Sequence, residues 1–109
     1  MAMSIDFDVS KIVDFKDVLR MAQIQKPGSS ELSITVPENV LRKVLENELR
    51  NPNFHAHTIE GNVFIKYDQE LPTGTMIRIF TVENKGNGSV LIKENPMSYD
   101  ANLIRRMDR

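Results

Sequence analysis

The sequence predicts a small single α+β domain over residues 1–109, with two to three helices packed on a mainly antiparallel sheet of about five to six strands. Helical periodicity is confined to the first half of the chain and to its last dozen or so residues, whereas residues 54–94 alternate as strands between turn residues. With 109 residues, 40% of them hydrophobic, the chain is long enough to build one core without disulfides.

The first two expected elements are a strand and a helix. Ile5, Phe7 and Val9 alternate with polar residues, as in a strand with one buried face. Asp14 stands where a helix N-cap is preferred, and Asp17 follows in the first turn, where a carboxylate is favourable. An apolar stripe at helical spacing lies beyond this cap and ends before a Pro-Gly pair: Phe15, Val18, Leu19 and Ala22.

A second strand and a second helix are expected next. Residues 32–36 alternate as a strand, and Pro37 then stands where a first-turn proline is tolerated. The following helix carries the clearest apolar stripe of the chain: Val40, Leu41, Val44, Leu45 and Leu49. Its other side holds oppositely charged pairs four residues apart, which are typical of a solvent-facing surface: Glu38 with Arg42, and Glu46 with Arg50. We expect the stripe to pack on these sheet residues: Ile34, Ile77, Ile79 and Leu91.

The second half of the chain is expected to consist of strands and turns. Residues 55–59 and 63–67 flank Glu60-Gly61-Asn62, which predicts a tight hairpin. Residues 68–74 read as a loop, because they combine charged residues with a proline and a glycine. The last expected elements are a strand over 75–83, a turn over 84–88, a strand over 89–94, and a short helix capped by Ser98 and striped by Ala101, Ile104 and Met107.

The stretch FHAHTIEG holds the only two histidines of the chain. His55 and His57 are two apart on an expected strand, so both imidazoles project from one face, where they could chelate a metal or act as an acid/base pair. A metal site needs three or four ligands, and Glu60, Tyr67 and Asp68 do not follow at a recognised spacing. We therefore expect no metal and no cofactor. A small His-dependent enzyme or metal binder stays a minority hypothesis.

Several classes of function lack their sequence signals. The chain has no cysteine for a thiolate nucleophile and no Gly-Lys-Ser/Thr phosphate loop. Its net charge of −1 argues against a nucleic-acid partner, and no apolar run approaches the ~18–20 residues that span a bilayer. Residues 31–45 resemble the opening of a ribbon-helix-helix repressor, but a strand stands where its second helix should follow. No secretory signal is recognisable at the start, so we expect a cytoplasmic protein.

The leading functional hypothesis is a non-enzymatic binding or regulatory protein that acts through a protein–protein surface, such as a phage-type inhibitor of a host factor. An alternative is a protein that sequesters a small nucleotide-like ligand. Cations interleaved with aromatic rings suit a phosphorylated base. The candidate contacts of that kind are Lys66, Tyr67, Arg78, Phe80 and Lys93.

Self-association is the last expectation from the sequence. The strand over residues 31–36 has Ser33 and Thr35 on its polar face and no charge inside the run, so it is a lightly protected edge. The C-terminal stripe is too short to form a stable helix alone and has to dock on something. A second copy of the chain could cover both features, so we expect a homodimer at micromolar concentration.

Overall fold

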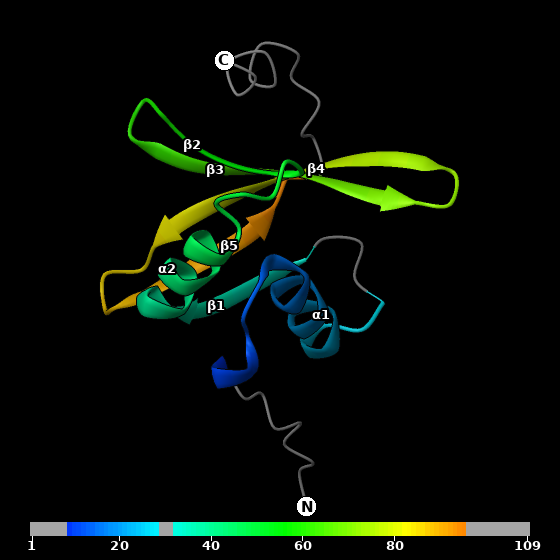
Figure 1. Cartoon of the computed structure of the whole chain (residues 1–109). Coiled ribbons are helices and arrows are strands. Elements are labelled where there is room, and N and C mark those ends of the chain that lie inside the picture. The colour runs from blue at the N-terminus through cyan, green and yellow to red at the C-terminus, as the bar shows by residue number, and fades with distance from the viewer. Residues whose placement is uncertain (1–8, 29–31, 96–109) are drawn as a thin grey trace, which may run out of the picture.

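The computed structural model describes residues 9–28 and 32–95, which form a five-stranded antiparallel sheet with two helices on one of its faces (Figure 1). The predicted α+β class is confirmed. The elements follow in this order: the short 3-10 helix η1 Val9–Lys11, α1 Phe15–Gln25, β1 Ser33–Pro37, α2 Glu38–Asn47, β2 Phe54–Ile59, β3 Asn62–Leu71, β4 Gly74–Asn84 and β5 Ser89–Glu94.

The strands lie in the order β1-β5-β4-β3-β2, and each neighbouring pair is antiparallel. β2 to β5 follow one another through hairpin turns, whereas β1 pairs with β5, the last described strand of the chain. Ile34 of β1 thereby lies opposite Ile92 of β5. Within the described sheet β1 is one edge and β2 the other, so the strand expected to be a lightly protected edge is indeed at an edge.

α1 begins at the predicted cap. The Asp14 side chain accepts a hydrogen bond from the Asp17 backbone N–H at 3.0 Å, and the Asp17 carboxylate accepts from the Asp14 N–H at 3.3 Å. This reciprocal pair is a capping box and satisfies donors that the helix itself leaves without partners. Asp17 also accepts from the Val13 N–H at 2.9 Å, which ties the incoming chain to the helix start.

The core lies between the two helices and the sheet. The predicted stripe of α1 is buried, and in α2 Val40, Leu41 and Val44 are buried while Leu45 packs against the cluster. Phe15 of α1 stands at the centre, since its ring lies 5.3, 5.2 and 5.0 Å from three other rings, measured between centroids. Those rings belong to residues of β2, β3 and β4: Phe54, Tyr67 and Phe80.

The end of α2 differs from the prediction. The helix ends at Asn47, and Leu49 is 80% exposed, so the prediction that Leu49 belongs to the core is wrong. The helical spacing of Leu49 is real, but the chain leaves the helix before reaching it. Glu48 turns inward instead, and its carboxylate accepts the Phe15 N–H at 3.3 Å. On the outer side of the helix, the predicted pair of Arg42 with Glu38 forms at 2.9 Å.

The hairpins are partly as predicted. Glu60 and Gly61 both have positive φ, 53° and 82°, as a two-residue type I′ turn requires. Residues 68–74 are not the predicted loop, because β3 continues to Leu71 and β4 starts at Gly74. Only Pro72-Thr73 separates the two strands. No described element covers this segment, so its residues are largely polar, and a polar composition is also typical of a loop.

The register divides the side chains of the sheet between two faces. The helix side carries the residues that pack on α1 and α2, among them Ile34, Ile65 and Phe80. The opposite face, which neither described helix covers, is called the helix-free face below. It carries His55, His57 and Ile59 of β2, Phe64 and Lys66 of β3, Ile77, Ile79 and Thr81 of β4, and Leu91 and Lys93 of β5.

The predicted partners of the α2 stripe are therefore right only in part. Ile34 lies on the helix side, whereas Ile77, Ile79 and Leu91 lie on the helix-free face. Both faces of β4 and β5 are apolar, so alternation alone does not identify the face that meets the helices.

Val9 belongs to a 3-10 helix and not to a strand. The rest of the predicted first strand and the predicted C-terminal helix lie outside the described residues.

Candidate functional site

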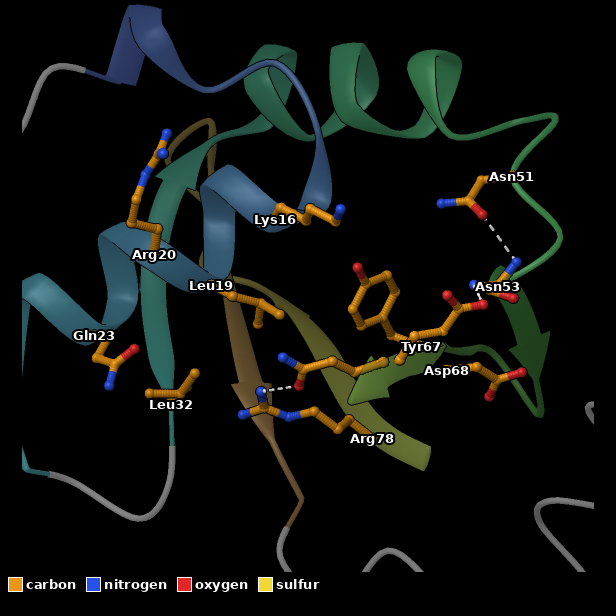
Figure 2. Close-up of a pocket in the computed structure, with 12 residues that line it drawn as sticks. Lys16, Leu19, Arg20, Gln23, Leu32, Asn51, Asn53, Tyr67, Asp68 and Arg78 are labelled. Carbon is orange, nitrogen blue, oxygen red and sulfur yellow. Dashed lines mark hydrogen bonds between the residues drawn. The ribbon is translucent and has the colours of Figure 1, made fainter. Parts of the chain in front are cut away.

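A pocket of about 550 Å³ lies between α1 and the end of the sheet where β3 and β4 pass beneath it (Figure 2). α1 supplies one wall, the α2–β2 connection a second, and the helix side of β3 and β4 the floor. The lining residues are Lys16, Leu19, Arg20, Gln23, Leu32, Asn51, Asn53, Tyr67, Asp68, Gln69, Glu70 and Arg78.

Tyr67 is the aromatic residue of this pocket. Its ring packs on Phe15 at 5.2 Å between centroids, and its hydroxyl points toward Lys16 of α1 without a hydrogen bond to any described residue (Figure 2). Burial raises the pKa of Tyr67, and the nearby carboxylates of Glu48 and Asp14 raise it further. The phenol therefore stays protonated at neutral pH and offers a hydrogen-bond donor to a ligand.

Arg78 closes the sheet side of the pocket, and three of its five N–H donors already have acceptors. Its guanidinium binds Glu94 in a bidentate pair at 2.8 and 2.7 Å and donates to Gln69 at 3.0 Å. It also lies 5.6 Å from the centroid of the Phe80 ring. A guanidinium held in this way is a rigid wall, and it could offer a ligand a bidentate pair through its Nε edge only by leaving Glu94.

The remaining polar walls are rich in amides. Asn51 Oδ1 accepts the Asn53 N–H at 2.9 Å, and Asn53 Nδ2 donates to Glu70 at 3.4 Å. Arg20 is paired with Asp17 at 2.6 Å, so the basic and acidic groups around the pocket are nearly balanced. None of the lining residues is a serine, threonine, cysteine or histidine. The lining thus offers amide, phenol and charged groups for hydrogen bonds to a ligand.

The two histidines lie elsewhere. His55 and His57 share the helix-free face of β2, as predicted, with ring centroids 6.2 Å apart and planes at 30°. Within residues 9–28 and 32–95, no three His, Cys, Asp or Glu side chains are grouped closely enough to hold a metal ion. No helix of these residues is long and apolar enough to cross a membrane.

The structure divides the five candidate contacts for a nucleotide-like ligand. Tyr67 and Arg78 meet in the pocket, whereas Lys66 and Lys93 lie on the helix-free face. Phe80 is 1% exposed and belongs to the core. Neighbouring residues of a strand point to opposite faces, so the sequence already predicts that Lys66 and Tyr67 lie on opposite faces of the sheet. The pocket residues that sequence reasoning missed come from α1 and from the α2–β2 connection: Lys16, Arg20, Asn51 and Asn53.

A second surface feature adjoins the pocket. Residues 68–77, called the arm below, are the outer parts of β3 and β4, which pair with each other from Asp68–Ile77 to Leu71–Gly74. No third described strand pairs with the arm, and it extends away from the two helices (Figure 1). Leu71 and Met76 are 39% and 38% exposed, and the register places both on the helix side, beyond the reach of α1.

No protein-family model, no curated protein and no solved structure matches this chain.

Proposed function

We propose that the protein is a non-enzymatic binding protein that recognises another protein through the arm. The observation that carries this proposal is an exposed apolar pair, Leu71 and Met76, on a two-stranded arm whose outer backbone edges pair with no other described strand. A surface of this kind acts by occupying a site on its partner, which is how an inhibitor of the phage type would block a host factor.

The arm offers a partner both backbone and side-chain contacts. Between residues 69 and 76 no described strand pairs with the outer edges of the arm, and an extended segment of a partner can add to their N–H and C=O groups as a further strand. A two-stranded hairpin is marginally stable in water by itself, so a third strand also stabilises the arm. Complete burial of each two-fifths-exposed apolar side chain would add roughly 1 kcal/mol to the binding free energy.

Site-specific photo-cross-linking tests this proposal. A benzophenone amino acid at Met76 is irradiated in an extract of the cells in which the protein occurs, and the same probe at Leu49 is the matched control. Leu49 is the most exposed large apolar residue described and lies away from the arm, on the α2–β2 connection. We expect one discrete cross-linked protein from the Met76 position alone.

The variant Leu71→Ser should abolish that product, while Leu49→Ser leaves it unchanged. Both replaced side chains are exposed, so each substitution should change the free energy of unfolding by less than about 0.5 kcal/mol. Products that are the same from both probe positions would contradict recognition through the arm.

A second candidate function, binding of a small nucleotide-like ligand, is favoured by the Tyr67 hydroxyl. This donor lines the pocket without a partner among the described residues, with which Lys16 above it likewise forms no ion pair. Titration with the four ribonucleoside monophosphates, followed by NMR, tests it. Tyr67→Phe should weaken binding about 10-fold through one lost hydrogen bond. Lys93→Ala, on the other face, should change nothing, and equal losses in both variants would contradict a site in this pocket.

A further inference from the structure

Two amide side chains that line the pocket have orientations fixed by charged neighbours. Asn53 Nδ2 donates to the Glu70 carboxylate at 3.4 Å, and Gln69 Oε1 accepts from the Arg78 guanidinium at 3.0 Å. A carboxylate only accepts hydrogen bonds and a guanidinium only donates them, so a flip of either amide would break its bond. The pocket lining therefore contains Asn53 Oδ1 as an acceptor and Gln69 Nε2 as a donor, neither of them bonded to another described residue.

Asn53 and Glu70 together form one wall of the pocket, called the acceptor wall below. The hydrogen bond between them uses Glu70 Oε1 and leaves Oε2 without a partner among the described residues. Asn53 Oδ1 belongs to the same amide, so the two remaining acceptors are neighbours. Two neighbouring acceptors, one of them charged, suit a ligand group that carries two N–H donors.

The cationic side of the pocket lies apart from the acceptor wall. Lys16 and Arg20 come from α1, and Asn53 lies on the far side of Tyr67 from Arg20 (Figure 2). Arg20 is already paired with Asp17 at 2.6 Å, so of these two cations Lys16 is the one left for an anion. A ligand that spans the pocket therefore meets Lys16 and the Tyr67 hydroxyl at one end and the acceptor wall at the other.

A nucleoside monophosphate with an amino-bearing base has this distribution of groups. Its phosphate is an anion, and the exocyclic amino group of cytosine or adenine is a donor with two N–H groups. Uracil instead presents one N–H between two carbonyl oxygens, so a carbonyl oxygen would face the Glu70 carboxylate. The cavity of about 550 Å³ is within the range of roughly 300–1,000 Å³ that is usual for small-ligand pockets.

We propose that the pocket selects nucleotides whose base carries an exocyclic amino group over uridine monophosphate (UMP), an inference that rests on the second candidate function above. The phosphate binds at Lys16 and the Tyr67 hydroxyl, and the amino group donates to the acceptor wall. Gln69 Nε2 supplies a donor for a ring nitrogen of the base. Glu70 determines the selectivity, both through its own charge and through the orientation that it imposes on Asn53.

Cytidine monophosphate (CMP) and UMP are a matched pair of ligands, because they differ only in the amino or carbonyl group of the base and in the proton on the adjacent ring nitrogen. Their dissociation constants are measured by NMR titration in the wild-type protein and in Glu70→Gln, Glu83→Gln and Lys16→Ala. Glu83 is exposed and lies outside this pocket, so its variant controls for the loss of one negative charge. The ratio of the two constants is read within one protein, so the folded fraction of a variant does not affect it.

We expect CMP to bind at least about 10-fold more tightly than UMP in the wild-type protein and in Glu83→Gln, as hydrogen bonds to a charged acceptor imply. Glu70→Gln should lower this ratio to about 2 or less, because the neutral amide can present either an oxygen or an N–H group. Lys16→Ala should weaken the binding of both nucleotides by the same factor and leave the ratio unchanged.

The outcomes separate this selectivity from nucleotide binding itself. Equal affinities for CMP and UMP in the wild-type protein would overturn the selectivity and leave nucleotide binding in the pocket intact. A preference for CMP that persists in Glu70→Gln would also overturn it, because the acceptor wall would not be its source. Absence of binding by both nucleotides would contradict the second candidate function, and the selectivity with it.

Discussion

The two faces of the sheet are built from similar residues but stabilised in different ways. On the helix side, three aromatic rings meet the ring of Phe15, and α1, which carries Phe15, is capped at its start and hydrogen-bonded to Glu48. On the helix-free face, Ile79 is equally buried, but it is surrounded by partly buried apolar residues, two histidines and Lys66. Two residues can therefore be equally buried although the contacts around them contribute differently to the stability of the protein.

The largest expected effect is at the centre of the helix side. Phe15→Ala removes the ring that touches three others, so the free energy of unfolding should fall by about 3–5 kcal/mol. The neighbouring exposed Lys16→Ala should cost less than about 0.5 kcal/mol. Chemical denaturation of both variants measures the difference. A loss below 1.5 kcal/mol for Phe15→Ala would break the comparison, because the helix side would not be the dominant core.

The next effect concerns a buried carboxylate on that side. Glu48 is 8% exposed and accepts the Phe15 N–H at 3.3 Å, one of the donors that the first turn of α1 leaves without a partner. Glu48→Ala should destabilise the protein by about 1–3 kcal/mol, because this donor is then buried and unsatisfied. Glu46→Ala, at an exposed position of the same helix, serves as the control. Equal losses in the two variants would show that the inward hydrogen bond contributes nothing.

A matched pair of isoleucines sharpens the comparison directly. Ile65 and Ile79 are both 0% exposed, on opposite faces of neighbouring strands. Replacement of either by valine should cost about 0.5–1.5 kcal/mol. Denaturant unfolding and amide hydrogen exchange would distinguish the two faces. Ile65→Val should lower the free energy of global unfolding, whereas Ile79→Val should chiefly increase amide exchange through local opening on the helix-free face. Identical exchange patterns in the two variants would mean that both faces unfold as one unit.

The smallest effect depends on pH and lies at the start of α1. Burial acts against ionisation of Asp17, but hydrogen bonds from the Val13 and Asp14 backbone and the charge of Arg20 outweigh it, so its pKa lies below the usual 3.8. The stabilisation is therefore complete above pH ~4 and is lost as the pH falls through the folded-state pKa. Asp17→Asn should cost about 0.5–1 kcal/mol at pH 7 and almost nothing near pH 2. A pH-independent difference in unfolding free energy would exclude this carboxylate as its source.

The fold could be predicted largely because local signals marked its elements. The Asp14 and Asp17 capping box, the helical stripes and the turns at Glu60-Gly61 and residues 84–88 each act over a few residues. The end of α2 could not be predicted in the same way. It depends on Glu48 reaching back to the N-terminus of α1, a contact across 33 positions that has no signature in either segment.

The candidate site was less accessible from the sequence. Tyr67 and Arg78 were predicted together and do meet, because they pair directly across β3 and β4. Lys16 and Asn53 join them only through the packing of α1 and the α2–β2 connection on the sheet. Residues 68–74 of the arm were predicted as a loop because their charged residues, proline and glycine are typical of one, whereas the strand that starts at Gly74 was predicted from residue 75.

The pairing of β1 with β5 has a consequence for how the protein is made. Ser33 lies opposite Lys93, so a ribosome that has completed β1 must still synthesise four further elements before the partner strand exists. Closing so long a loop is slow relative to forming a local hairpin. Nascent chains that stop short of β5 leave β1 without a partner and the cluster around Phe15 without its complete sheet. We expect the fold to be completed only after residues 89–94 have left the ribosomal tunnel, with the unpaired β1 open to chaperones until then.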